Sequence, residues 1–529
     1  MRSINHRGAV APSWLLVGCG LIGLLVLAPL VYLVVRAFGQ ADGAQVGAVL
    51  LGATTFEYLV RSLALALVVS SCSVFLSLLL AWSTCARDLP GRRLMNVLVV
   101  APLAVPCYVG AAIYLGAVSP GGFLSGIGPQ LGLSPGWFSG FWASAFILVL
   151  FIYPLAYLPI RSSLARIDPA TFDAARLLGC SRIEAARRTF FPQLRSSIVV
   201  GGTMVSLYTL SEFGAVSLLR CNTFTRVIYL QYESAFDRVG ASLSSLVLVA
   251  IIAVLLLLSE RLRGRSLNQR AGRSVRPLRW NLGRARWGVL GLVGVVCLLA
   301  LVIPVASLIA WWARSSATEL VTDLGESLLT TLLLSLSAGL LVVLCSIPLA
   351  LLCTRYPSRS GAFIERLAHL GFGLPGIVVG LALVFLSLHL VPWLYQTWGV
   401  VVVGYLVLFL ALGTGPIRVG FEQASIRAEE AARTLGAGWW TRLRLVTLPV
   451  VMPGLISSFL LVFITTTKEL PSTLLLAPAG THTLATRVWE YTEEAMYAEA
   501  ALPALLLMIL SAALVGLMVW REDLLERRP

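Results

Sequence analysis

The chain has 529 residues, of which 58% are hydrophobic and 12% are charged, whereas soluble domains average about 45–50% apolar and about 25% charged residues. This composition disfavours a soluble fold of this size and excludes intrinsic disorder. The formal net charge of +15 raises the question of a nucleic-acid partner. None is predicted, because the arginines lie between apolar segments, the placement that orients membrane proteins.

Apolar spans recur along the whole chain, and most approach the roughly 20 residues that a membrane-crossing helix needs. Segments this apolar must be helical in lipid, because each backbone polar group needs a partner within its own segment. The sequence therefore predicts an all-α polytopic membrane protein with twelve spans, at 14–35, 63–82, 97–118, 141–160, 198–219, 239–258, 289–312, 328–353, 367–388, 400–417, 454–476 and 502–520.

Arginine placement predicts the orientation. The segments 83–96, 161–195 and 261–286 are rich in arginine, whereas 119–140 and 389–399 contain no Asp, Glu, Lys or Arg. Because cytoplasmic loops carry the excess of positive residues, we expect both termini in the cytoplasm. The predicted first half is 1–259, with its large cytoplasmic loop at 161–197. A basic linker follows at 260–286, and the second half is 287–529 with its loop at 418–453. An even number of spans makes the two six-helix halves parallel.

The residues present argue against an enzyme. Lys468 is the single lysine and precedes Glu469, so the Gly-Lys-Ser/Thr of a phosphate-binding loop is missing. The nine cysteines are scattered and the four histidines form no local cluster, so neither a disulfide framework nor a zinc site is predicted. We expect no cofactor bound by this chain.

An internal repeat lies in the two large cytoplasmic loops. An acid followed by two alanines, a glycine and a proline recurs with a constant offset of 257 residues: Asp173, Ala174, Ala175, Gly179 and Pro192 in the first half, and Glu430, Ala431, Ala432, Gly436 and Pro449 in the second. We expect the acid to open a short helix at its positive dipole end, the alanines to allow close approach, the glycine to end the helix sharply, and the proline to precede the next membrane helix. The pattern predicts a helix-turn-helix that fits a groove on another protein.

This repeated pattern resembles the E-A-A-x-x-x-G-x9-I-x-L-P signature of permease subunits in binding-protein-dependent ABC importers. The first copy departs from it at Asp173, Thr189 and Phe191, and the second at Val446. The resemblance implies that each loop inserts a coupling helix into a cytoplasmic ATPase, which uses the ATP. It also implies two ATPase copies, a periplasmic or lipid-anchored binding protein, and a bacterial inner-membrane location.

A narrower resemblance covers most of the chain. The segments 88–93, 222–238, 468–471 and 486–488, with the acidic stretch 490–499, resemble the fused two-half permeases of ferric-iron importers. Related permeases for thiamine, polyamines or anions share the coupling loop, so these cargoes stay open as alternatives. A twelve-span secondary transporter is a further alternative, although such a protein has no use for the duplicated loop.

Two acids lie inside predicted spans, Glu212 and Glu469, again 257 residues apart. An acid within a membrane segment is costly and is a functional candidate, and a hard cation such as ferric iron prefers oxygen ligands. The alternative is that each pairs with a neighbour: Glu469 with Lys468 or Arg487, and Glu212 with Arg220. Tyr208 and Ser211 are weaker candidates for the same face, and Gly376 and Gly380 have the spacing of close helix packing.

Two longer outer segments, 222–238 and 478–500, carry most of the outer acids: Glu233, Asp237, Glu490, Glu493, Glu494 and Glu499. Charge complementarity makes them the expected docking surface for a soluble binding protein.

Overall fold

The computed structural model describes residues 11–40, 43, 46–47, 52–86, 89–119, 122, 125–126, 130, 136–165, 167, 169–263, 283–314 and 320–526. Every secondary-structure element in these ranges is helical, which confirms the all-α prediction. Eight of the helices are long and apolar enough to cross a membrane, and the number reaches ten if each of two bent helix pairs is one span. The chain is therefore a multi-pass membrane protein. The predicted spans 198–219 and 367–388 are not among these ten, so the count of twelve stays a prediction.

The chain forms two compact units. Unit 1 comprises Met1–Asp42, Glu319–Arg487 and Ala513–Pro529, and unit 2 comprises Gly43–Thr318 and Val488–Ala512. This grouping differs from a simple division at the basic linker, most of which lies outside the described residues. The predicted boundaries 1–259, 260–286 and 287–529 therefore stay a prediction.

Unit 2 contains fourteen helical segments in its described ranges, besides its shares of α24 and α25: α3 (Ala53–Thr84), α4 (Arg92–Val100), η1 (Ala101–Ala104), α5 (Cys107–Val118), α7 (Gly140–Ile152), α8 (Pro154–Ala165), α9 (Pro169–Leu177), α10 (Arg182–Ser211), α11 (Gly214–Leu218), α12 (Phe224–Glu233), α13 (Arg238–Arg263), α14 (Ala285–Cys297), the π-helical η2 (Leu298–Val302) and α15 (Ile303–Trp312). Its centre is the packing of α3, α8 and α10. Between α8 and α10 the backbones approach closely, since a Cβ on Gly201 would lie 2.8 Å from the Ala156 Cα.

Unit 1 contains α1 (Ser13–Gln40), α16 (Leu320–Arg355), α17 (Arg359–Leu370), η3 (Gly371–Gly373), α18 (Gly376–Leu390), η4 (Pro392–Leu394), α19 (Trp398–Gln423), α20 (Ile426–Thr434), α21 (Trp439–Arg442), the π-helical η5 (Leu443–Thr447), α22 (Leu448–Thr467) and α23 (Pro471–Leu476). The helices α24 (Leu484–Glu493) and α25 (Tyr497–Glu526) contribute to both units. The centre of unit 1 is the packing of α16, α19 and α22.

The same helix crossing lies at the centre of both units, but the glycine is on a different helix of the crossing in each unit. In unit 1 a Cβ on Gly413 of α19 would lie 2.5 Å from Val342 and 3.1 Å from the Ser458 hydroxyl on α22. Gly413 and Ser458 lie 257 residues after Ala156 and Gly201. The glycine therefore sits on the third helix of the trio in unit 2 and on the second in unit 1. A small pair at this crossing is what lets membrane helices pack at short range.

The first helix of each half packs on residues from the other half. Helix α1 belongs to unit 1, where Gly23 faces Ile364 and Leu367 of α17. Helices α14 and α15 belong to unit 2, where the Tyr114 hydroxyl donates to the Leu299 carbonyl at 2.8 Å. Each unit therefore needs a segment from the other half of the sequence to complete its core.

Candidate coupling segments and translocation residues

The first repeated loop forms a helix-turn-helix from α9 to the start of α10. Gly179 ends α9 with a φ of +87°, a conformation that costs glycine nothing. The Gly179 N–H donates to the Arg176 carbonyl at 3.1 Å and the Cys180 N–H to the Ala175 carbonyl at 3.2 Å. Ser181 then caps α10 by accepting from the Glu184 N–H. The prediction of a glycine-terminated helix is confirmed here.

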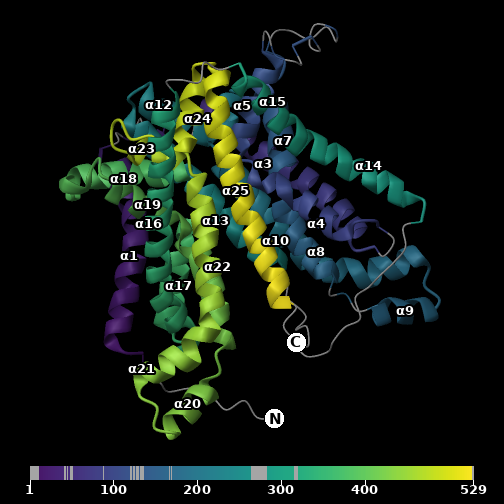
Figure 1. Cartoon of the computed structure of the whole chain (residues 1–529). Coiled ribbons are helices and arrows are strands. Elements are labelled where there is room, and N and C mark those ends of the chain that lie inside the picture. The colour runs from purple at the N-terminus through teal and green to yellow at the C-terminus, as the bar shows by residue number, and fades with distance from the viewer. Residues whose placement is uncertain are drawn as a thin grey trace. The chain divides into compact units, whose positions relative to one another are not determined.

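The second loop reproduces this turn bond for bond. Gly436 has a φ of +81°, its N–H donates to the Arg433 carbonyl at 3.0 Å, and the Ala437 N–H donates to the Ala432 carbonyl at 3.0 Å. Each of these atoms lies 257 residues after its counterpart. The turn between α20 and α21 lies beyond the ends of α19 and α22, at the opposite end of unit 1 from α23 (Figure 1).

Both turns expose the same face. Asp173, Ala174 and Gly179 are exposed, as are Glu430, Ala431 and Gly436, whereas Ala175 and Ala432 are half-buried. A leucine precedes each glycine, and its exposed fraction is 85% at Leu178 and 87% at Leu435. An apolar side chain presented in this way on both copies suits contact with another protein.

Two details of the predicted loop are wrong. Asp173 and Glu430 lie in the fifth positions of α9 and α20, so neither acid opens its helix; the first turn of α20 holds Glu429 instead. Pro192 lies inside α10, which continues from Arg182 to Ser211, whereas Pro449 does lie in the first turn of α22. A continuous helix joins the turn to the membrane segment in both units, and in unit 1 it runs from Trp439 to Thr467 with the π-helical η5 inside it.

The two coupling helices are anchored by different forces. In unit 2 the rings of Phe172 and Phe190 stack with centroids 5.1 Å apart and an interplanar angle of 19°. The positions 257 residues later are Glu429 and Thr447, and here the Thr447 hydroxyl donates to the Glu429 carboxylate at 2.9 Å. The same carboxylate oxygen forms an ion pair with Arg355 of α16 at 2.7 Å. The repeated pattern did not single out Glu429, because the acid of that pattern is its neighbour Glu430.

Glu212 lies between the long helix α10 and the short helix α11, and Glu469 lies between α22 and α23. The Glu212 carboxylate accepts from the Ala215 N–H of α11 at 3.0 Å. The Glu469 carboxylate accepts from the Ser472 N–H of α23 at 3.2 Å and from the Ser472 hydroxyl at 2.9 Å. The two acids thus share a capping role that the sequence did not predict.

Arg487, which was one of the expected partners of Glu469, has an ion-pair partner of its own. Arg487 lies 3.8 Å from Asp323, with which it forms an ion pair. Glu212 belongs to unit 2 and Glu469 to unit 1, so a shared role in a pathway stays a prediction. Tyr208 and Ser211 lie in the last turn of α10, and 37% of Tyr208 is exposed.

The glycine pair on α18 packs against the segment that follows Glu469. A Cβ on Gly376 would clash with the Glu469 carboxylate, and one on Gly380 would lie 3.0 Å from Leu475 of α23. The predicted close packing is therefore confirmed, and its partner is α23. Substituting either glycine would displace the loop that carries Glu469.

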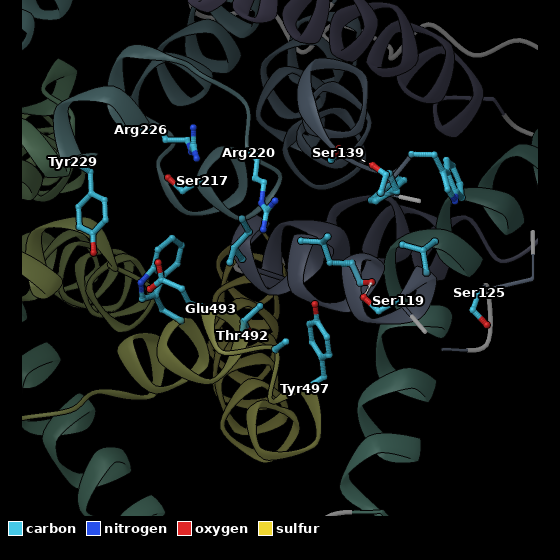
Figure 2. Close-up of a pocket in the computed structure, with 18 of the residues that line it drawn as sticks. Ser119, Ser125, Ser139, Ser217, Arg220, Arg226, Tyr229, Thr492, Glu493 and Tyr497 are labelled. Carbon is cyan, nitrogen blue, oxygen red and sulfur yellow. Dashed lines mark hydrogen bonds between the residues drawn. The ribbon is translucent and has the colours of Figure 1, made fainter. Parts of the chain in front are cut away.

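A pocket lies in unit 2 among the ends of α5, α7, α11, α12 and the α24–α25 turn (Figure 2). It contains Glu493, which was expected on the outer docking surface, and two arginines, Arg220 and Arg226, which the sequence did not single out for this role. Burial raises the pKa of Glu493, and Glu233 and Glu494 nearby raise it further against the opposing effect of a hydrogen bond from Trp489.

Comparison with known proteins finds similarity to transport permeases along most of the chain. The sequence model of the Binding-protein-dependent transport system inner membrane component family matches residues 73–270 and 346–529. The Fe(3+)-transport system permease protein FbpB 2 of Haemophilus influenzae is 30% identical over 517 residues, which cover 96% of this chain and 98% of that protein.

Two further relatives match about half of the chain or less. The putative 2-aminoethylphosphonate transport system permease protein PhnV of Salmonella typhimurium is 27% identical over 190 residues, or 36% of this chain and 72% of that protein. The sulfate transport system permease protein CysW of Escherichia coli is 25% identical over 278 residues, or 49% of this chain and 90% of that protein.

Proposed function

The chain belongs to the family of binding-protein-dependent transport system inner membrane components, and on this basis we propose that it is the permease of an ATP-driven importer that moves ferric iron into the cytoplasm. The observation that carries the proposal is the duplicated turn, with identical backbone bonds and an exposed leucine in both copies. The similarity to a ferric-iron permease over nearly the full length of both chains supports the cargo.

The two turns are the proposed contacts with the ATPase. Two matched turns call for two ATPase copies, one for each half. Asp173, Ala174, Ala175 and Gly179 form one contact and Glu430, Ala431, Ala432 and Gly436 the other, while Pro192 and Pro449 mark the helices that transmit the movement. ATP is hydrolysed in the partner, and this chain does no chemistry of its own.

Transport follows by alternating access. Movement of the coupling helices would rock the two six-span halves about a central path for the cargo. With both termini in the cytoplasm, the turns face the ATPase, and the segments 222–238 and 478–500 face a periplasmic or lipid-anchored binding protein. Glu212 and Glu469 are proposed to face iron along the path. Substitution of each by glutamine removes the charge but leaves a side-chain oxygen that can still accept the backbone N–H at the start of the next helix.

An anion is the second candidate cargo. Two relatives that match part of the chain are named as permeases for 2-aminoethylphosphonate and sulfate. Thiamine and polyamines are less favoured, because none of the relatives described above is named for them. A secondary transporter would leave the duplicated turns without a role.

The experiment measures uptake and ATPase capture together. In a strain that lacks this chain, the intact gene should restore uptake of labelled ferric iron but not of labelled thiamine or sulfate. Leu178→Glu with Leu435→Glu should abolish co-purification of the ATPase, since fully burying a leucine is worth about 1.5–3 kcal/mol. Trp393→Glu is the control, because Trp393 is 78% exposed in η4 and belongs to neither turn segment.

Three outcomes separate the parts of the proposal. Retention of the ATPase by the double leucine variant would refute the coupling role. Restored uptake of sulfate in place of iron would refute the cargo and leave the coupling role intact. Unchanged iron uptake in Glu212→Gln with Glu469→Gln would remove these two acids from the path.

A further inference from the structure

The pocket of unit 2 has a volume of about 960 Å³, which is at the upper end for sites that hold small molecules. Five of its nineteen lining residues are aromatic: Trp137, Phe138, Tyr229, Trp489 and Tyr497. Figure 2 shows Arg220, Arg226 and Ser217 at one side of the pocket and Thr492, Glu493 and Tyr497 across from them. All of these residues belong to unit 2.

The two arginines lack a carboxylate partner. Within the part of the chain that the structure describes, neither guanidinium forms an ion pair, and Arg226 donates instead to the neutral side chain of Asn222. Burial lowers the pKa of Arg226, and the nearby Arg220 lowers it further. Arg226 is half-buried and Arg220 is exposed, and two like charges held close together are unfavourable unless a negative charge compensates them.

Arg220 also has a backbone conformation that disfavours arginine. Its φ is +55°, in the left-handed region that only glycine adopts without cost. Arg220 lies just after the end of α11, where its N–H donates to the Ser217 carbonyl and the Cys221 N–H donates to the Val216 carbonyl. Glycine is the usual residue at such a helix end, because it adopts a positive φ at no cost. Unit 2 therefore bears backbone strain at a position that would ordinarily favour glycine.

A strained backbone at a pocket is a reason to look for a function, and the side chain that this backbone carries into the pocket lining is a guanidinium. Ser217 lines the same pocket, and its hydroxyl has no hydrogen-bond partner among the described residues. Buried polar groups of this kind call for an explanation, and a ligand that accepts hydrogen bonds supplies one.

We propose that this pocket binds a small anion through carboxylate or phosphate oxygens, with Arg220 and Arg226 as its charged contacts and the aromatic side chains enclosing the remainder. A guanidinium presents paired donors that match such oxygens. A bare ferric ion does not suit the pocket, because two uncompensated cations repel it. The proposal is independent of the transported cargo, since it concerns a site built by unit 2 alone.

The test measures thermal unfolding of the detergent-purified full chain against rising inorganic phosphate or citrate at constant ionic strength. A ligand that binds only the folded protein raises the unfolding midpoint in a saturable manner. We expect saturation with at least one of the two anions in the unaltered protein. In Arg220→Gly the midpoint without anion should be unchanged or higher, because the strain is relieved, while the anion affinity should fall at least tenfold.

A matched control isolates the guanidinium from the strain. Phe236 also has a positive φ, of +53°, and lies in unit 2 outside the pocket lining. Phe236→Gly should relieve strain in the same way and leave anion affinity unchanged. Equal anion response in Arg220→Gly and in the unaltered protein would overturn the proposal, as would a response that never saturates.

Lipid provides the second source of the same chemistry. If phosphate and citrate have no effect, the comparison is between lipid nanodiscs of phosphatidylcholine and of phosphatidylglycerol. A midpoint raised by phosphatidylglycerol and lost in Arg220→Gly identifies the anion as a lipid phosphate. A midpoint that is the same in both lipids, after no response to the soluble anions, refutes the site.

Discussion

The carboxylate of Glu429 is the anchor of the second coupling helix, and Glu429→Ala is the sharpest test of how that helix is held. The substitution removes two hydrogen bonds, from Arg355 at 2.7 Å and from Thr447 at 2.9 Å. It also leaves Arg355, whose side chain is only 12% exposed, without this partner. A hydrogen bond to a charged group contributes about 1.5–3 kcal/mol. Because the Glu429 side chain is 29% exposed, we expect a cost of about 2–3 kcal/mol rather than the larger value for a fully buried pair.

That cost falls on the docking of α20 rather than on the whole fold. At about 1.4 kcal/mol for each factor of ten, the population of undocked α20 should rise roughly 30- to 150-fold. Amide hydrogen exchange, resolved by mass spectrometry, should therefore accelerate within 426–434. In liposomes that contain the ATPase, the amount of cargo moved per ATP should fall, because an undocked helix transmits less of the ATPase movement.

The control is Arg188→Ala, which breaks the pair with Glu184 at the start of α10. Its side chains are 68% and 45% exposed, and exposed pairs contribute only about 0–1 kcal/mol. Arg355→Leu with Glu429→Leu should recover most of the lost protection, since removing both charges leaves neither buried alone. Unchanged exchange in Glu429→Ala would refute the reasoning, because α20 would then be held by something other than this ion pair.

Three further substitutions test the turns, the helix crossing and the pocket. Gly436→Ala should destabilise unit 1 by about 1 kcal/mol in a thermal melt because of its positive φ, whereas Gly438→Ala, at a φ of −63°, should not. Gly413→Ala should cost about 1–3 kcal/mol in the same melt, because its Cβ would lie 2.5 Å from Val342, while Gly415→Ala on the same helix has no neighbour within 4 Å and should be neutral or stabilising. In the pocket, the raised pKa of Glu493 means that this acid becomes neutral early as the pH falls. Anion affinity should therefore rise on acidification, and Glu493→Gln should remove most of that rise. The other ionisable groups near Glu493 are unchanged in this variant and contribute any pH dependence that remains: Glu233, Glu494 and Tyr229. An unchanged pH profile in Glu493→Gln would contradict this assignment.

The repeat spacing predicted the turns well because their geometry is local. A helix that ends in the left-handed region requires glycine within one residue of a fixed place, so Gly179 and Gly436 could be identified from sequence alone. The membrane helices were predictable for a similar reason, since a long apolar run in lipid has few other conformations.

The anchors could not be predicted in the same way, because they depend on tertiary contacts. Arg355 and Glu429 are 74 residues apart, and nothing in either segment indicates that they meet. The role of Pro192 was misjudged because tolerance of a proline inside α10 depends on the surroundings of that helix. The pocket could not be predicted either, because its lining comes from segments as far apart in sequence as Leu115, Arg220 and Glu493.

The repeat preserves only part of the surroundings of the two helices α9 and α20. The outward side is the same in both copies, from the bonds of the turn to the exposed leucine. The inward side differs completely, with a ring stack between Phe172 and Phe190 in one unit and an ion pair from Glu429 in the other. The first anchor is an apolar contact, whereas the second depends on the charges of Arg355 and Glu429. A substitution that removes charge should therefore release α20 and leave α9 in place, even though both copies present the same outward surface. A permease built from two identical subunits has no such asymmetry available, because a change in one anchor is a change in both.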